Sequence, residues 1–493
     1  MWWSYREGMD DAIEAKPRPS WIAGQPEQGA TELLVHHPYD GTEVASVAVP
    51  GPDQVERAVQ AAADVAGTFR SSPAHLRASA LMHVSEQLAV RREEIAEVIT
   101  AENGKPLKWA DGEVNRAIST FRFAAEEARR FTGEMQRLDT DPAAEGRLAL
   151  VRRVSRGPVL GIAPFNFPLN LVAHKVAPAI AVGSPIIVKP APRTPLSALI
   201  LGEILAETDL PAGAFSVLPV GNEETIALVK DPRLPVVSFT GSGPVGWSIM
   251  DSVPRKHVVL ELGGNAAAVV AGDWSSEADL DFAAKRIALF ANYQAGQSCI
   301  AVQRVIVDSA VADEFVPRLV ASVRDLITGD PHDPDVEVGP LVDTAAAERV
   351  AAWVDEAVKD GAELLAGGHR AGATIEPTVL ANVPHDSKVW AEEVFGPVLA
   401  VSVVDGDDAA LAAVNDSAYG LQAGLFTHNL QLAFRAAAEL EVGGLIVGDV
   451  PSYRADQMPY GGVKGSGVGR EGLRSAMADF TEERVLVLTN VKF

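Results

Sequence analysis

From residue 148 onward the sequence alternates short, continuously apolar runs with stretches of helical character, and this alternation restricts the fold more than any other feature. Helical stretches at 197–208 and 223–230 separate several of the runs. The apolar runs cover 159–162, 185–188, 215–220, 236–239, 258–262 and 266–270. Strands that are apolar at every position are buried on both faces, as in a parallel sheet covered by helices. The sequence therefore predicts an α/β protein.

A second unit of the same kind follows the first. Its helices are expected at 311–326 and 345–360, and its strands at 398–404, 424–427 and 444–447. A chain of 493 residues exceeds what one hydrophobic core supports, so two or three domains are expected. Ahead of both units, residues 1–50 read as an irregular arm with short strands. Helices are predicted at 52–68, 74–103 and 110–131.

Charge and apolar patterning exclude several classes of function. Subtracting 66 acidic from 42 basic residues gives a net charge of −24, which repels nucleic acid and anionic membranes. The longest apolar run, 176–188, contains two prolines and a glycine and is too short to cross a bilayer. The start MWWSYREGMDD shows no signal peptide pattern. With one cysteine in the whole chain, these features indicate a cytoplasmic protein without nucleic-acid or membrane partners.

Cys299 is that only cysteine, and it lies between an apolar helical run, 282–290, and a β-branched strand near 305–307. A thiol on a loop between two rigid elements is placed as nucleophiles often are. The alternative is a small buried hydrophobe. Gly296, Gln297 and Ser298 weaken that alternative because a packing cysteine usually has apolar neighbours.

Few other motifs with a known chemistry occur in the sequence. Gly241 to Gly246 matches G-x-G-x-x-G after a strand, but Pro244 lies inside it and residues 467–472 match without a preceding strand. The motif alone therefore indicates only backbone amides able to hold a phosphate. No metal-binding, nucleophile-elbow or phosphate-loop motif occurs. The ten histidines are interpreted as surface or core residues, and no metal site is predicted.

Seven short segments resemble, in order, motifs of the aldehyde dehydrogenase superfamily. They are PFNFP, VKPA, SFTGS, LELGGN, GQSC, EEVFGPV and PYGGVKGSGVGRE, and they span residues 160 to 470. The resemblance implies a Rossmann-like cofactor domain (1–132 and 157–262, with 449–482), an α/β catalytic domain (263–448) and a small β oligomerisation flap (133–156 and 483–493). It also implies a homodimer or homotetramer.

By the same resemblance, Cys299 is the nucleophile that forms a thiohemiacetal with the aldehyde, in a site expected to favour the thiolate. Asn166 and the Cys299 backbone N–H hold the oxyanion. After hydride leaves to the nicotinamide, Glu261 is the general base that hydrolyses the thioester. The alternative for Glu261 is a structural acid at a strand end.

The resemblance further implies an NAD or NADP site, with NAD slightly favoured. Lys189 would bind the adenosine ribose, and Glu393 with Phe395 the nicotinamide ribose. The family pattern has a glutamate three residues after the lysine, whereas this chain has Pro192 and then Arg193. The usual argument for NAD over NADP therefore fails. The remaining residues expected around the cofactor are Phe165, Phe239, Gly241, Ser242, Gly246 and Leu262.

The substrate is expected to be a small anionic aldehyde or semialdehyde, because 449–462 and 299–304 resemble lactaldehyde, succinate-semialdehyde and phosphonoacetaldehyde dehydrogenases. Arg454, with Arg116 as a second contact, would bind the anion. Alternatively Arg454 pairs with Asp456 or faces solvent, and Arg116 is solvated. Three other functions are considered: oxidation of neutral aldehydes, a CoA-acylating reaction, and a catalytically silent protein on the same fold. Glu261 argues against the CoA-acylating reaction. The complete set of Cys299, Asn166 and Glu261 argues against a silent protein.

Overall fold

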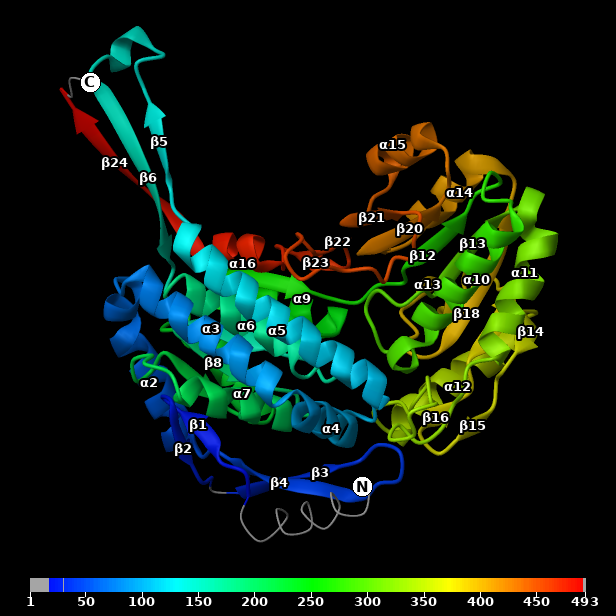
Figure 1. The fold of residues 1–493 in the computed structure, drawn as a ribbon, viewed down its shortest axis with the longest axis horizontal. Coiled ribbons are helices and arrows are strands. Elements are labelled where there is room, and N and C mark those ends of the chain that lie inside the picture. Colours follow the sequence, from blue (N-terminus) through cyan, green and yellow to red (C-terminus); the bar gives the residue numbers. More distant parts are fainter. Residues whose placement is uncertain (1–16, 30, 491–493) are drawn as a thin grey trace.

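The computed structural model describes residues 17–29 and 31–490. Figure 1 shows two helix-covered sheets side by side and a three-stranded flap that projects from the first of them. The start of the sequence and residues 491–493 of the predicted flap lie outside the described residues. Within residues 17–29 and 31–490, no helix is long and apolar enough to span a membrane.

The first sheet has eight strands, and the central five are parallel. In spatial order they are β2 (Gln25–Glu27), β1 (Ser20–Ile22), β9 (Phe215–Val217), β8 (Ile186–Lys189), β7 (Val159–Ile162), β10 (Val236–Thr240), β11 (His257–Glu261) and β23 (Gly467–Val468). Numbered along the chain, the parallel strands run 3-2-1-4-5, the Rossmann order. The strand order reverses between β7 and β10, where such sheets bind ligands.

Helices cover both faces of this sheet because alternate strand residues point to opposite faces. Val159 packs into one core and Leu160 into the other. The Val159 side holds α3 (Ala74–Val90), α4 (Arg92–Asn103), α5 (Leu107–Arg130), α6 (Asn170–Ala181), α7 (Leu196–Ala206) and α16 (Leu473–Asp479). The Leu160 side holds α2 (Pro52–Arg70), α8 (Asn222–Lys230) and α9 (Gly243–Ser252).

The second sheet has seven strands, parallel except for β14 at one edge. Their order is β14 (Glu363–Ala366), β17 (Thr378–Ala381), β18 (Val398–Val404), β13 (Arg304–Asp308), β12 (Ala267–Val270), β20 (Gln422–Phe426) and β21 (Gly444–Val447). One face carries α10 (Glu277–Asn292) and α11 (Ser309–Arg324). The other carries α12 (Thr344–Lys359), α13 (Lys388–Ala391), α14 (Gly406–Asn415) and α15 (Leu430–Glu439).

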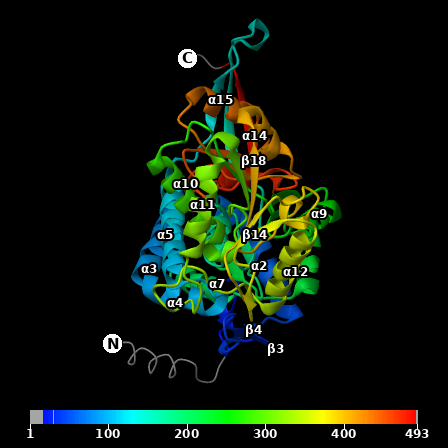
Figure 2. The ribbon, with the colours of Figure 1, turned by 90° about the vertical axis from the view of Figure 1, so that its right-hand side faces the viewer.

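Two antiparallel appendages lie at opposite ends of the molecule (Figure 2). The flap pairs β5 (Glu134–Arg137) and β24 (Thr481–Thr489) with β6 (Arg147–Ser155). The hairpin joins β3 (Thr31–His36) to β4 (Glu43–Val49). The remaining short strands are β15 (Arg370–Ala371), β16 (Thr374–Ile375), β19 (Tyr419–Gly420) and β22 (Val463–Lys464).

Three sequence predictions need correction. The expected single helix 74–103 is two helices, because Arg91 leaves helical geometry (φ −96°, ψ 19°) and bonds Glu94 and Glu203. The arm contributes β1 and β2 to the first sheet. The helix predicted at 110–131 begins earlier, at Leu107, directly after Pro106.

The three-part division of the chain stays a proposal. The first sheet draws its strands from 20–27, 159–261 and 467–468, and the second from 267–447. These ranges are compatible with the boundaries that the resemblance implies.

Candidate active site

Four of the expected site residues lie at one edge of the first sheet. Phe165 and Asn166 follow β7, Lys189 ends β8, and Glu261 ends β11. Because β7, β8, β10 and β11 are parallel, their carboxyl ends share this edge at the point where strand order reverses. The fold therefore gathers residues up to 96 positions apart in sequence.

The second sheet faces that edge with the segments that lead into β13 and β18. The Asn166 Nδ2 atom donates to the Gln297 carbonyl (2.8 Å), two residues before Cys299. The Phe165 and Phe395 rings meet edge to face at 5.9 Å. Glu393 accepts from the Gly264 N–H (3.0 Å). Catalytic and cofactor residues expected from sequence thus meet between the two sheets.

A strained turn presents Cys299. Gln294, Ala295 and Gly296 all have left-handed backbones, with φ of 55°, 52° and 70°. At Gly296 a Cβ would overlap the Gly396 carbonyl, so only glycine fits. The Cys299 N–H has no acceptor in the described part of the chain, and the Sγ atom lies 2.9 Å from the Tyr460 hydroxyl. A free N–H beside a thiol suits an oxyanion.

The expectation that the site favours the thiolate is wrong for the protein alone. Burial raises the pKa of Cys299 to about 12, only partly opposed by the Tyr460 hydrogen bond, and the Glu393 carboxylate raises it further. The resting residue is therefore a thiol at neutral pH. A base must take its proton when it attacks.

A fully buried ion pair holds the Asn166 loop. The Lys105 ammonium pairs with Glu113 and donates to the Asn166 carbonyl (2.9 Å). The same ammonium lies 4.0 Å above the Phe167 ring. Glu113 accepts from the Leu169 and Asn170 N–H groups (2.9 and 3.0 Å). Both ends of the loop are therefore fixed to the start of α5.

Glu261 is buried and belongs to a chain of polar contacts. Thr240 donates to Glu261 (3.0 Å), and the Lys175 ammonium donates to Thr240 (2.7 Å) and to Ser238 (3.1 Å). Burial and the nearby Glu471 carboxylate raise the pKa of Glu261 to about 8, although Lys175 acts in the opposite direction. A carboxyl with such a pKa can both take and release a proton near neutral pH.

Two positions at the start of α9 require glycine because neighbouring side chains pack against the backbone there. A Cβ at Gly241 would overlap the Phe239 ring, and one at Gly246 would overlap Leu262. Ser242 is the exposed N-cap and accepts no hydrogen bond with its side chain. The first N–H groups of this helix are therefore available to an anion.

Lys189, Pro192 and Arg193 lie along the segment that leaves β8. Lys189 is buried, and its side-chain ammonium has no hydrogen-bond partner among the described residues. Burial lowers the pKa of this ammonium to about 8. Pro192 is exposed. The Arg193 guanidinium is also exposed and pairs with Asp343 (2.7 Å). Arg193 therefore points to a surface carboxylate in this state.

The two arginines expected at the substrate mouth are both in ion pairs. Arg454 is buried, pairs with Glu471 and stacks 4.0 Å over the Tyr460 ring. The alternative that Arg454 pairs with Asp456 or faces solvent is therefore wrong. Arg116 instead pairs with Asp456 (2.8 Å) and stays partly exposed. Tyr460 therefore contacts both the Arg454 guanidinium, through its ring, and the Cys299 thiol, through its hydroxyl.

Several residues of the site carry no sequence prediction. Tyr460 lies in the PYGG segment that supports the resemblance, and Lys175 is a lone charge inside an apolar helix, which was an available signal. The sequence contains no signal for the pairing of Lys105 with Glu113. The other unpredicted residues are Thr240, His174, Glu471 and Asp456.

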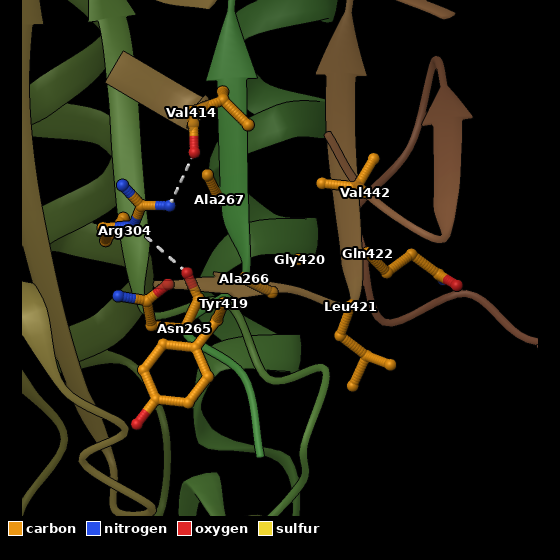
Figure 3. A pocket seen from close by; sticks show the side chains of 10 residues that line it. All are labelled: Asn265, Ala266, Ala267, Arg304, Val414, Tyr419, Gly420, Leu421, Gln422 and Val442. Atoms are coloured by element: carbon orange, nitrogen blue, oxygen red, sulfur yellow. Dashed lines mark hydrogen bonds between the residues drawn. The ribbon is translucent and has the colours of Figure 1, made fainter. Parts of the chain in front are cut away.

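A hollow of about 10 Å³ beside the LELGGN segment is not a ligand site (Figure 3). Arg304 lines it and donates to the carbonyls of Asn265 and Val414 (3.1 Å each). The remaining space holds about one water. Asn265 also bonds the Trp390 carbonyl (3.1 Å), so this part of the motif braces the second sheet.

Comparison with known proteins agrees with this geometry. The family model described as "Aldehyde dehydrogenase family" matches residues 23–486. The chain belongs to the aldehyde dehydrogenase family. The expected aldehyde dehydrogenase fold and enzymatic class are thereby confirmed.

Two curated relatives align over nearly their whole length. A 3-sulfolactaldehyde dehydrogenase from Priestia megaterium is 42% identical over 97% of this aldehyde dehydrogenase and 100% of that protein. A lactaldehyde dehydrogenase from Methanococcus maripaludis is 34% identical over 93% of this chain and 98% of that protein. Both relatives are named for small polar aldehydes.

Solved structures of the family share the fold. Aldehyde dehydrogenase 21 from Physcomitrella patens, in complex with the reaction product succinate, is 44% identical with a TM-score of 0.95, covering 97% of this chain and 99% of that one. An NADP-dependent glyceraldehyde-3-phosphate dehydrogenase from Bacillus halodurans, complexed with NADP, is 33% identical with a TM-score of 0.91 over 97% and 100%. An NAD-dependent member from Sinorhizobium meliloti is 31% identical with a TM-score of 0.92 over 98% and 96%.

Alkylation of Cys299 tests its thiol state. Only the thiolate reacts, and below a pKa near 12 its fraction rises about tenfold per pH unit. We expect iodoacetamide labelling, followed by intact mass, to accelerate about tenfold per unit from pH 7 to pH 9. Cys299→Ala leaves no cysteine and is the blank. A rate that levels off below pH 9 would show a stabilised thiolate instead.

Proposed function

We propose that this enzyme oxidises an aldehyde to a carboxylic acid through a thiohemiacetal and then a thioester on Cys299, with Glu261 as the base that activates water. The observation that supports this best is the joint placement of three groups between the sheets. They are the thiol of Cys299 with its free N–H, the Asn166 amide tied to the same loop, and the buried carboxyl of Glu261.

Addition to the aldehyde uses Cys299 and Asn166. The Sγ atom bonds to the carbonyl carbon while the thiol proton passes to solvent water, so Glu261 is not required until hydrolysis. The new oxyanion accepts from the Cys299 N–H and from the second N–H of Asn166, since the Gln297 contact uses only one. One such donor lowers the barrier by about 3 kcal/mol.

The residues at the edge of the first sheet fit a nicotinamide dinucleotide. Unsatisfied N–H groups at the start of α9 and the ammonium of Lys189, which has no partner among the described residues, are what a pyrophosphate and a ribose require. Glu393, Phe395 and Phe165 would hold the nicotinamide end. When bound there, the cofactor supplies the hydride acceptor.

Hydrolysis of the thioester falls to Glu261. Its carboxylate takes a proton from water, the water oxygen bonds to the acyl carbon, and Sγ leaves as a thiolate that is reprotonated. Thr240 orients the carboxyl, and Lys175 holds Thr240. An acylating enzyme that passes the acyl group to CoA needs no such base, so Glu261 supports hydrolysis over that reaction.

Glu261→Gln should separate the two half-reactions. The amide keeps the shape of the side chain but cannot deprotonate water, so we expect one equivalent of reduced cofactor per chain and then a stall. Rapid absorbance and the intact mass of an acyl group on Cys299 measure this without CoA. Cys299→Ala should show neither burst nor turnover while still binding cofactor. Absence of both burst and acyl-enzyme in Glu261→Gln would mean that Glu261 acts before hydride transfer.

For the cofactor, we infer that NAD and NADP are both usable, with NAD slightly favoured. Pro192 cannot repel a 2′-phosphate, and the ion pair between Arg193 and Asp343 is exposed and therefore weak, about 1 kcal/mol or less. Arg193 can thus turn to a phosphate at little cost. Family members with either cofactor exist.

Two variants at this ion pair test the inference. We expect Arg193→Ala to lower kcat/KM for NADP about tenfold and leave NAD unchanged, while Asp343→Asn frees the arginine and raises kcat/KM for NADP. The asparagine can still cap α12. A wild-type preference above about a thousandfold, roughly 4 kcal/mol, would show that another group sets the selectivity.

For the substrate, we infer a small aldehyde that carries a carboxylate, sulfonate or phosphate group. The Arg454 guanidinium lies over the ring of Tyr460, whose hydroxyl contacts the Cys299 thiol, and the Arg116 guanidinium lies 5.9 Å from the ring of Phe167, the residue after Asn166. Named relatives act on 3-sulfolactaldehyde or were crystallised with succinate. Arginine makes paired, charge-assisted bonds to such anions.

Charge-balanced variants test this recognition, because Arg454→Ala alone would leave Glu471 buried without a partner. We compare kcat/KM for succinate semialdehyde with that for butanal, a neutral aldehyde of equal length. Arg116→Gln and the double variant Arg454→Gln with Glu471→Gln should each lower this ratio about tenfold or more. Arg122→Gln, on the exposed face of α5, is the matched control. An unchanged ratio, or equal rates for both aldehydes in the wild type, rejects anion recognition.

We further propose that the enzyme is a homodimer or homotetramer in the cytoplasm. The edge strand β24 exposes Val485, Leu486 and Val487 on the projecting flap. A long apolar edge strand is a ready surface for pairing with another chain.

A further inference from the structure

His37, Asp330 and His332 form a cluster that shares no residue with the candidate active site. One ligand atom from each, an imidazole nitrogen or a carboxylate oxygen, lies within 4.8 Å of the others. His37 follows β3 in the hairpin, and the other two lie on the loop between α11 and α12. The residues are separated by up to 295 positions, so no linear motif could indicate the cluster.

The decisive atom is Nε2 of His37. This side chain is only 5% exposed, and its Nδ1 lies 2.9 Å from the Ala101 carbonyl. A carbonyl only accepts, so Nδ1 carries the hydrogen and Nε2 presents a lone pair. That lone pair has no partner among the described residues. A buried acceptor without a partner is costly, whereas a carbonyl behind one imidazole nitrogen is how proteins orient a metal-binding histidine.

The remaining donors approach from two other elements. The His332 ring centroid lies 5.2 Å from that of His37, and its Nδ1 lies 3.3 Å from Asp330 Oδ1. Glu97, on α4, brings Oε2 to within 3.9 Å of His332 Nε2. Asp330 and His332 are exposed to solvent in part or in full, so an ion can reach the cluster.

We propose that His37, His332 and Asp330 bind a divalent transition-metal ion of the Zn²⁺ type, with Glu97 as the fourth ligand. Two imidazoles and carboxylates suit Zn²⁺, whereas Ca²⁺ and Mg²⁺ prefer oxygen ligands alone. A surface turn, in which Asp330 accepts a hydrogen bond from the His332 N–H (3.0 Å), explains why Asp330 and His332 lie close together. It does not explain the unpartnered Nε2 of His37.

The ion would tie three elements together close to the catalytic loop. The hairpin, α4 and the 329–343 loop all supply ligands. Farther along that loop, Val342 donates to the Gln297 side chain (2.9 Å), whose backbone carbonyl also holds Asn166. The site is therefore a structural clip whose loop braces the turn before Cys299.

Metal titration of the full chain tests the proposal in a Cys299→Ser background, which removes the thiol as a competing ligand. We expect one Co²⁺ per chain, with visible d–d absorption and no sulfur-to-cobalt charge-transfer band, displaced by Zn²⁺. Zn²⁺ should also raise the thermal unfolding midpoint. His37→Asn and His332→Asn should each weaken binding at least tenfold, since even losing an outer partner does so.

His385→Asn, which changes an exposed histidine beside Asp416, is the matched control and should bind as the parent does. The unfolding midpoint of each variant without metal shows whether it is folded. Absence of stoichiometric binding overturns the proposal, as does binding of equal strength in folded His37→Asn and His332→Asn proteins.

Discussion

A fully buried ion pair, Lys105 with Glu113, fixes the loop on which the catalytic geometry depends. Two charges taken out of water are costly unless every donor and acceptor is used. Here Glu113 accepts from two loop amides and Lys105 donates to the Asn166 carbonyl. The pair therefore cannot reorganise without leaving several buried groups unpaired. This rigidity keeps the Asn166 amide beside the turn that carries Cys299, which is the placement that an oxyanion donor would need under the proposed function.

Buried charges of alternating sign near Glu261 help to set the pKa of its carboxyl group. Burial alone would raise the pKa of Glu471, but Arg454 lowers it to about 2, so Glu471 stays ionised. Its charge adds to burial and raises the pKa of Glu261 to about 8. Arg454 thereby influences the pKa of Glu261 through Glu471. Under the proposed function, recognition of the substrate anion and the pKa of the base would therefore be electrostatically linked.

Much of this architecture could be predicted because a strand buried on both faces appears in the sequence as a continuous apolar run. Strand β18 was expected at 398–404 and occurs there, since every buried strand residue must be apolar. The break at Arg91 could not be seen, because the helical spacing continues across it. Asn166 lies beside the turn that carries Cys299, and the Glu261 charge acts on the pKa of that thiol. Their energetics could not be predicted, because the thiol pKa and the partner of Arg454 depend on Tyr460 and Glu471, which only the tertiary fold brings near.

Strands β23 and β24 come from the last part of the described chain, yet they complete structures that begin more than two hundred residues earlier. β23 closes the first sheet against β11, and β24 pairs with β6 along nine residues. During synthesis the edges of β11 and β6 must therefore wait, unpaired, while the entire second sheet is translated. An open strand edge invites pairing with other chains. The nascent protein is thus most exposed to aggregation before its final strands leave the ribosome, and a molecular chaperone would be of most use in that interval.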